Sequence, residues 1–383
     1  MKDAIYLDYA AATPVDETVL SAMMPYFSEQ FHNPSSVYLA SRDVKAVLDD
    51  ARAEVAHWLG SRPSEVVFTA GATEANNLAL NLVDDGMAIV SSIEHEAILE
   101  PAAQHPHVIV GVDQRGMLDL EELESAIDAN TQLVSIMYAN NEIGTVQHIS
   151  DIAQLIANER DRRRGAGEKR PIWFHTDASQ AANYLDLHVD KLGVDLMTIS
   201  AGKIYGPKQV AALYVRAGIV VKPLLLGGGQ ERGIRSGTEN VSGAVGLAAA
   251  LKKSQKMRKD ENYRLHGLSS KLIAGITDTF DDAKVLGHKK HRLPNIVSCT
   301  IPGIDGERVV MMLDEHGFQI ATGSACSAMS DESSHVVKAL GRNETEAQST
   351  LRISMGRNTT EEDIDKFLEV LPRVISEARS LNA

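Results

Sequence analysis

The chain has 383 residues, of which 44% are hydrophobic and 23% charged, and these proportions argue against a disordered, collagen-like or coiled-coil protein. Its 38 basic and 52 acidic side chains give a formal net charge of −14, so we expect no direct binding of nucleic acid or of a membrane surface. The only cysteines are Cys299 and Cys326, which argues against a disulfide-stapled secreted fold and favours a reducing, cytoplasmic setting. We also expect no signal peptide and no membrane span, because no apolar run reaches about 18 residues.

Helical and strand patterns alternate through the first two thirds of the chain. Apolar residues at helical spacing cover residues 43–59 and end at Gly60, and a short buried strand follows at residues 66–68. Further strands are predicted at residues 87–90, 108–112, 133–137, 172–174, 196–199 and 211–215, with helices between several of them, including residues 119–128 and 150–159. This alternation predicts an α/β fold in which helices sandwich a mainly parallel sheet.

The pattern changes in the last third of the chain. Residues 241–273 predict one or two long helices. After them we expect a strand at 296–301, a helix at 306–316, a loop around 321–334, a strand at 350–354 and a final helix at 361–381. This order is typical of a smaller α+β domain. We therefore predict a large domain over residues 15–255 and a small domain built from residues 1–14 and 256–383.

A lysine stands directly after one of the predicted buried strands. Lys203 follows the small residues 200–202 and precedes a Gly206-Pro207 turn. Burial lowers the pKa of a lysine, and the neutral amine can form a Schiff base with an aldehyde cofactor. Taken alone, a lysine in such a place is more often a solvated loop residue.

Two further segments follow predicted strands in the same way. Residues 69–73 read Thr-Ala-Gly-Ala-Thr before a helix, where small residues let backbone N–H groups approach a phosphate and the helix dipole favours its charge. Asp177 stands at the carboxyl end of a predicted inner strand, where it would suit a pyridinium N–H. Each has a simpler explanation as well, a plain turn for the first segment and a helix N-cap for the second.

Taken together, the phosphate turn, the aspartate and the lysine resemble the fold-type I enzymes that depend on pyridoxal 5'-phosphate, in their class V aminotransferase branch. Other stretches narrow the resemblance to the cysteine desulfurase family and its bacterial NifS/IscS group. They include Asn-Asn-Glu-Ile-Gly at 140–144, Gly-Gly-Gly-Gln-Glu-Arg-Gly at 227–233 and Thr-Gly-Ser-Ala-Cys at 322–326. The resemblance extends from residue 4 to about residue 372.

The resemblance implies a role toward the cofactor for each matching residue. Lys203 would hold the cofactor as a Schiff base and later move protons at the substrate Cα. His95 would stack on the pyridine ring and act in acid–base catalysis. Asp177 would pair with the pyridine nitrogen and Gln180 with the phenolic oxygen. The phosphate would be bound by Ala72, Thr73 and Ser200, with Thr238 reaching across from the other subunit of a homodimer.

The resemblance also implies how the substrate, L-cysteine, is handled. Asn141, which also borders the cofactor, and Arg352 would hold its carboxylate, a task that suits the arginine fork. Cys326 would be the nucleophile, become a persulfide and leave L-alanine. The acceptor protein for the sulfur stays open among iron–sulfur cluster assembly, tRNA thiolation and DNA phosphorothioation. We expect no metal site, apart from a transient iron–sulfur contact of Cys326, and we expect Cys299 to be an inert core residue.

Two positions near the lysine depart from the family pattern. The family usually has a histidine directed at the phosphate where this chain has Gly202. The loss of that hydrogen bond, worth about 1.5–3 kcal/mol, predicts weaker retention of the cofactor. Gln209 replaces a commoner glycine, with no evident consequence. The chain also ends without the longer C-terminal tail of relatives that dock an iron–sulfur scaffold, so we do not expect that particular partner.

Three other functions are compatible with these residues. A selenocysteine lyase would look almost identical and would differ in its turnover of the two amino acids. A class V aminotransferase would share the scaffold but would not need Cys326. A non-catalytic sulfur-relay subunit would have lost the cofactor, and only Gly202 favours it, since the lysine, aspartate, histidine, arginine and cysteine are all present.

Overall fold

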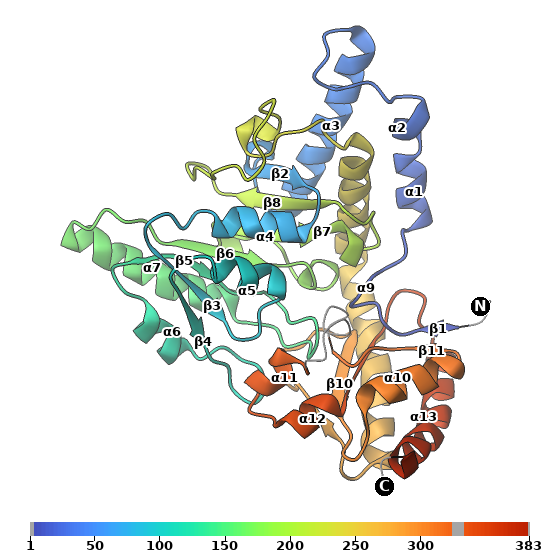
Figure 1. The fold of residues 1–383 in the computed structure, drawn as a ribbon. Coiled ribbons are helices and arrows are strands. Elements are labelled where there is room, and N and C mark those ends of the chain that lie inside the picture. The colour runs from blue at the N-terminus through green and yellow to red at the C-terminus, as the bar shows by residue number, and fades with distance from the viewer. Residues whose placement is uncertain (1–3, 324–332, 382–383) are drawn as a thin grey trace.

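The computed structural model describes residues 4–323 and 333–381, and a seven-stranded sheet forms its centre (Figure 1). The strands lie in the order β2-β8-β7-β6-β5-β3-β4. They are β2 (Val66–Thr69), β3 (Met87–Ser91), β4 (His107–Val110), β5 (Thr131–Ser135), β6 (Trp173–Asp177), β7 (Leu196–Ser200) and β8 (Ala211–Val215). Only β8 runs against the rest of this sheet, pairing antiparallel with both β2 and β7. The predicted α/β class with a mainly parallel sheet is confirmed.

Helices cover both faces of this sheet because its strands are apolar on both sides. Val66 and Phe68 of β2 belong to the main core, which also takes in the apolar faces of α3 (Leu39–Leu59) and α9 (Val241–Thr279). Val67, between them, packs with α4 (Ala72–Leu80) in a separate cluster. Since alternate residues of a strand point to opposite faces, α4 and the α3–α9 pair lie on opposite sides of the sheet.

The remaining helices of this part connect the strands or precede them. Their bounds are α1 (Glu17–Met23), α2 (Pro25–Ser28), α5 (Glu96–Ala102), α6 (Leu120–Ala126), α7 (Ile149–Ala166) and α8 (Val189–Leu192). The connections between parallel strands are therefore mostly helical, as the alternating pattern predicts. Within the two described ranges, no helix is both long and apolar enough to cross a membrane.

A second, smaller assembly follows in the last third of the chain. It contains the three-stranded antiparallel sheet β12-β10-β9 and a parallel pair that joins the N-terminal strand to β11. The elements are β1 (Ile5–Tyr6), β9 (Lys284–Val285), β10 (Ile296–Thr300), α10 (Gly306–Glu315), β11 (Phe318–Gln319), α11 (His335–Ala339), α12 (Glu344–Gln348), β12 (Thr350–Ser354) and α13 (Glu361–Leu381). Cys299 is fully buried in β10, and burial raises the pKa of its thiol to about 12, which agrees with an inert core residue.

One helix joins the two assemblies. The stretch predicted to form one or two helices forms a single helix of 39 residues, α9, which crosses residue 255 without a break. It packs against α1 and α3 beside the large sheet and against α13 at its other end (Figure 1). The N-terminal strand β1 also lies with the smaller assembly, through its pairing with β11. The division into domains at about residue 255 stays a prediction.

Candidate active site

The carboxyl ends of β2, β6 and β7 border a cavity of about 350 Å³. Parallel strands end at the same edge of a sheet, so the polar segments that follow them converge there. Nine residues singled out from the sequence line this cavity: Ala72, Thr73, His95, Asn141, Asp177, Gln180, Ser200, Lys203 and Arg352. The structure therefore brings together residues that lie up to 280 positions apart (from 72 to 352).

The other two predicted site residues do not line it. Thr238 is exposed and lines an adjoining cavity of about 180 Å³, together with Thr69, Ala70 and Arg235. Cys326 lies outside the described residues, so its catalytic role stays a prediction.

Glu142 lies against described residues on both sides of the cysteine segment. The Ser334 hydroxyl donates to Glu142 Oε2 at 2.5 Å. On the other side, a Cβ on Gly323 would lie 2.9 Å from the same oxygen, so this glycine passes very close to the carboxyl. Burial raises the pKa of Glu142, while the Ser334 hydroxyl and Arg352 act against that shift. Glu142 thus contacts the described residues that precede and follow Cys326 in the chain.

The orientation of Asp177 is set by two donors. Asn76, on α4, donates from Nδ2 to Asp177 Oδ2 at 2.7 Å, and the Ser179 N–H donates to Oδ1 at 2.9 Å. Both oxygens are therefore held, and the carboxylate faces the cavity from the end of β6. Asn76 was not among the residues predicted from the sequence, although its place one turn after Ala72 on the same helix was a usable signal.

Two buried titratable side chains lie beside this arrangement and are uncharged at neutral pH. His175, two residues before Asp177, lies between Ser135 Oγ at 2.8 Å and Thr198 Oγ1 at 3.1 Å, and burial lowers its pKa to about 4. Burial raises the pKa of Glu94 to about 8. Hydrogen bonds to the Ser91 hydroxyl and the Met137 N–H act against this shift. The charges of the region are thereby concentrated on the residues that line the cavity.

Lys203 lines one side of the cavity and contacts residues 10 and 11 of the N-terminal segment. Its ammonium donates to the carbonyls of Ala10 at 2.9 Å and Ala11 at 2.7 Å. The Gln180 amide donates to the same Ala10 carbonyl at 2.9 Å. Asn183 in turn donates to the Lys203 carbonyl at 2.7 Å and fixes the backbone of the lysine. Residues 10 and 11 are thus a wall of the site.

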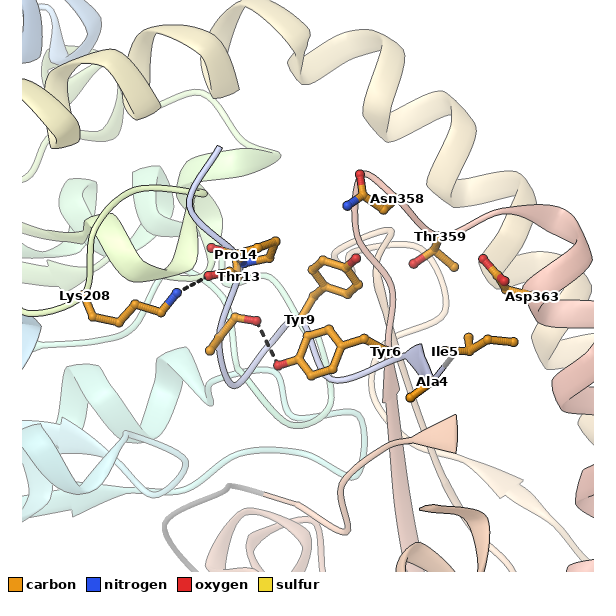
Figure 2. Close-up of a pocket in the computed structure, with 11 residues that line it drawn as sticks. Ala4, Ile5, Tyr6, Tyr9, Thr13, Pro14, Lys208, Asn358, Thr359 and Asp363 are labelled. Carbon is orange, nitrogen blue, oxygen red and sulfur yellow. Dashed lines mark hydrogen bonds between the residues drawn. The ribbon is translucent and has the colours of Figure 1, made fainter. Parts of the chain in front are cut away.

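A second cavity, of about 610 Å³, lies next to the N-terminal segment (Figure 2). Ala12 and Lys208 line both cavities, and the second is otherwise bordered by residues such as Tyr9 and Asp363. The Lys208 ammonium donates to the Thr13 carbonyl, toward which it points in Figure 2. Its charge is therefore engaged at the boundary between the two cavities.

His95 begins α5 as its N-cap. Its Nδ1 accepts a hydrogen bond from the Ala97 N–H at 3.0 Å. A ring nitrogen that accepts carries no proton, so in the neutral ring the proton is on Nε2. Nε2 lies 3.7 Å from a carboxylate oxygen of Glu96. The capping bond thus fixes both the orientation and the tautomer of this histidine at the cavity wall.

Arg352 reaches the cavity from β12 in the smaller assembly. Its side chain is 1% exposed, and Nη2 lies 2.7 Å from Asp8 Oδ1, while Nη1 donates to the Asn141 carbonyl at 3.2 Å. Its Nε is buried and has no hydrogen-bond partner among the described residues. A buried donor without a partner is costly, so this nitrogen is suited to an anionic ligand in the cavity. Asp8 had no predicted role, because it contacts Arg352 only in the folded chain.

The N-terminus of α4 is open to the cavity. Its N-cap is Gly71, no side chain caps the helix, and nothing lies within 4 Å of where a Cβ on Gly71 would be. The one acidic side chain of the first turn, Glu74, accepts from the Ala70 N–H at 2.7 Å and from Arg235 Nε at 3.0 Å. The first-turn N–H groups and the Thr73 hydroxyl therefore offer donors to an anion, with the helix dipole in its favour.

Comparison with known proteins agrees with this geometry. The aminotransferase class-V family model matches residues 5–367. Cysteine desulfurase IscS 1 of Archaeoglobus fulgidus is 41% identical over 388 aligned positions, which cover 98% of this chain and 98% of that protein. The solved structure of a NifS-like protein has a TM-score of 0.89 at 34% identity, covering 98% of this chain and 100% of that one. A structure of SspA in complex with cysteine has a TM-score of 0.76 at 34% identity, over 91% of this chain and 98% of that one.

The family model alone spans nearly the whole chain, and the relatives match it along almost their entire length. The resemblance inferred from the sequence motifs is thereby confirmed. The fold-type I architecture expected from it is also confirmed, because the NifS-like structure superposes over 98% of the chain. The chain belongs to the aminotransferase class-V family.

Proposed function

We propose that the protein is a cysteine desulfurase that depends on pyridoxal 5'-phosphate. It converts L-cysteine to L-alanine and takes up the sulfur as a persulfide on Cys326. The observation that carries the proposal is the convergence of Lys203, Asp177 and Arg352 on one cavity. Supporting it, several similar proteins are named cysteine desulfurases, and one similar structure was solved with cysteine.

The cavity fits this cofactor at each of its polar groups. The uncapped N-terminus of α4, with Thr73 and with Ser200 at the end of β7, suits the phosphate. Asp177 suits the ring nitrogen, and the Lys203 amine suits the aldehyde. Gln180 donates one amide proton to Ala10 and has a second for the phenolic oxygen. When bound, the cofactor draws electrons from the substrate Cα and so weakens the bonds to that carbon.

The substrate carboxylate is held by Arg352 and Asn141. The contact of Arg352 with Asp8 and its bond to the Asn141 carbonyl keep the guanidinium plane fixed, and the Nε proton is still available. A guanidinium binds a carboxylate through two N–H groups at once, which orients the amino acid as well as binding it.

Two residues handle protons. Lys203 would remove the proton from the substrate Cα as a neutral amine. His95 would lie against the cofactor ring, and its Nε2 would exchange a proton with the reacting groups, because its Nδ1 is occupied by the Ala97 N–H. The Ala10 and Ala11 carbonyls would accept hydrogen bonds from the lysine whenever its amine is not bonded to the cofactor.

Sulfur leaves through Cys326. Its thiolate forms a bond to the substrate sulfur while the Cβ–S bond breaks, and the electron pair stays with the three-carbon fragment. Protonation of that fragment at Cβ gives alanine, and the enzyme keeps the sulfur as a persulfide. An acceptor protein or a reductant must then remove this sulfur before the next turnover.

We further propose that the enzyme works as a cytoplasmic homodimer. Large apolar side chains are exposed around α1, α2 and the start of α3 and in the loop after β8: Phe27, Phe31, Val37, Leu39, Val220, Leu225 and Leu226. In Figure 1, α2, the start of α3 and the loop after β8 lie at the upper end of the view, and α1 lies beside the large sheet. Apolar surface of this kind is typical of a subunit interface, and Thr238 lies in the same loop region. The acceptor is a protein of unknown identity.

The test is an alanine-release assay on cofactor-loaded protein supplied with L-cysteine, with and without a thiol reductant. We expect multiple turnovers only with the reductant, and no alanine from Cys326→Ala under either condition. Alanine formation by Cys326→Ala at the rate of the unchanged enzyme would contradict the persulfide route. No alanine from cofactor-loaded wild-type protein would exclude the proposed reaction and leave an aminotransferase or a sulfur relay. Parallel assays with L-selenocysteine separate a desulfurase from a selenocysteine lyase.

A further inference from the structure

Gln209 lies between the central cavity, near the residues suited to a phosphate, and the adjoining smaller cavity. It lines the cavity of about 350 Å³ together with Thr73 and Ser200, and the adjoining cavity of about 180 Å³ together with Arg235 and Thr238. The side chain is exposed, and it makes no hydrogen bond to any residue in the part of the chain that the structure describes. Its amide is therefore available to a ligand in either cavity.

The sheet topology places residue 209 between the two segments suited to a phosphate. β8 runs antiparallel between β2 and β7, and its first residue, Ala211, is paired with both Thr69 and Ser200. Residue 209 precedes Ala211 by two positions, so it lies beyond the carboxyl ends of both neighbouring strands. The turn at residues 70–73 and the lysine turn at 200–203 leave the sheet at the same place.

The backbone of Gln209 favours a functional reason for its side chain. Its φ is +58°, in the left-handed region that glycine adopts freely and other residues adopt at a cost. Gly202 shows the opposite: its φ is outside that region, and the atoms nearest to an added Cβ would be those of Lys208 at 3.7 Å and the Pro207 carbonyl at 4.0 Å, which are ordinary contact distances. Gly202 is therefore a glycine at a position where the backbone does not require one. Gln209, nearby, is a long polar residue at a position where glycine would be unstrained.

We propose that Gln209 is a cofactor-binding residue whose side-chain amide donates a hydrogen bond to the cofactor phosphate beside Gly202. This inference rests on the proposed function, because it requires pyridoxal 5'-phosphate in the cavity. The amide carries two N–H donors at the end of a flexible stem, and it starts next to Lys208, the residue that a Cβ on Gly202 would touch. The Lys208 ammonium donates to the Thr13 carbonyl and is engaged there (Figure 2). Gln209 therefore offsets part of the loss of cofactor retention expected from Gly202.

The experiment measures binding of the cofactor and not turnover. The full-length protein is stripped and titrated with pyridoxal 5'-phosphate or with pyridoxal, which lacks the phosphate, and binding is followed by the visible absorbance of the bound ring. We expect Gln209→Ala to raise the dissociation constant for pyridoxal 5'-phosphate on the order of tenfold. Gln209→Glu should raise it further, because a carboxylate repels the phosphate. Affinity for pyridoxal should stay within about twofold of wild type in both variants.

Two further variants separate a phosphate contact from a structural role. Gln154→Glu makes the same change of charge at an exposed position of α7, away from both cavities, and should bind both ligands as wild type does. Gln209→Gly removes the strained φ, so it should raise the melting temperature of the cofactor-free protein while weakening pyridoxal 5'-phosphate binding. A purely structural role would move both quantities in the same direction.

The outcomes distinguish this inference from the proposed function. If wild type binds pyridoxal 5'-phosphate and the Gln209 variants bind it equally well, or lose pyridoxal to the same extent, the phosphate contact is refuted while the proposed function stands. If wild-type protein binds no pyridoxal 5'-phosphate at all, the proposed function fails and this inference fails with it. Loss confined to the phosphorylated ligand supports the contact.

Discussion

Asp177 takes its orientation from residues that the chain brings to it only on folding. Asn76 precedes it by 101 positions, yet donates to one carboxylate oxygen at 2.7 Å, while the nearby Ser179 N–H holds the other. A hydrogen bond to a charged group contributes about 1.5–3 kcal/mol. Asn76 therefore acts as a positioning residue, through Asp177, on whatever binds that carboxylate.

Replacing Asn76 tests this dependence at the scale of one residue. We expect Asn76→Ala to lower kcat for alanine release about tenfold with a small change in KM for cysteine, because the substrate-binding Arg352 is untouched. The absorbance of the bound cofactor should shift as well, since its ring nitrogen loses a fixed partner. Asn81→Ala, at the other end of α4, where the side chain donates to the Lys222 carbonyl, is the matched control. Equal kinetics and spectra in the two variants would rule out the positioning role.

The raised pKa of Glu94 predicts the direction in which the stability of the fold changes with pH. Burial raises its pKa from 4.5 to about 8 in the folded chain. Between these values the unfolded chain releases the proton and the folded chain keeps it. The contribution of Glu94 to stability is therefore complete below about pH 4.5 and is lost as the pH rises toward 8.

We expect Glu94→Gln to weaken this fall in stability between pH 5 and 8, because glutamine keeps the shape of the protonated acid and does not titrate. The measurement is the melting temperature of both proteins across that range. Glu124→Gln, at an exposed position of α6, should leave the pH profile as it is in wild type. An unchanged profile in Glu94→Gln would mean that the buried carboxyl does not hold its proton there.

At the scale of single elements, two helices end in the same way but in different surroundings. α3 ends at Gly60 with φ +65°, and α7 ends at Gly167 with φ +73°. Both are C-cap positions in the left-handed region, where a side chain costs about 1 kcal/mol. A Cβ on Gly60 would lie 2.3 Å from His188 Nε2, whereas nothing lies within 4 Å of one on Gly167.

This difference predicts unequal costs for the same substitution. Gly167→Ala should lower the free energy of unfolding by about 1 kcal/mol, through backbone strain alone. Gly60→Ala should cost about 2 kcal/mol or more, because the His188 ring must also move. Denaturant unfolding of both variants with unchanged slopes checks the comparison. Equal losses of unfolding free energy in the two variants would show that the His188 ring moves aside without cost.

At the scale of the whole molecule, the proposed dimer makes each site depend on both subunits. Thr238 does not line the central cavity of its own subunit, and it lies on an exposed loop beside the adjoining cavity. If it reaches the partner's phosphate, a site combines Lys203 of one chain with Thr238 of the other. A mixture of two defective chains can then contain an intact site.

We expect a mass of twice 41.5 kDa in solution and complementation on mixing. Lys203→Ala alone should be inactive and Thr238→Ala alone impaired, through weaker cofactor binding. When the two variants are mixed and exchange subunits, activity should be regained, because the hybrid dimer has one site with both Lys203 and Thr238 intact. The control is a mixture of Thr238→Ala with the double variant Lys203→Ala,Thr238→Ala. No hybrid dimer in this mixture contains a site with both residues intact. A monomer, or no gain over the control, would contradict the shared site.

The sequence by itself determined the α/β class, the family and the chemical groups placed after the strands. It could do so because hydrophobic periodicity specifies which face of an element is buried, and Lys203, Asp177 and the phosphate turn directly follow buried strands. The same local logic predicted the strand that buries Cys299.

Only the tertiary structure decided which distant side chains act on these groups. Arg352 contacts Asp8, Asn76 contacts Asp177, and Gln209 lies between two turns. Packing and the antiparallel direction of β8 bring these segments together. Their spacing in the sequence does not predict these contacts. The uncharged state of Glu94 also depends on the folded chain, because a pKa shift of this kind arises from burial and partners that no local pattern specifies.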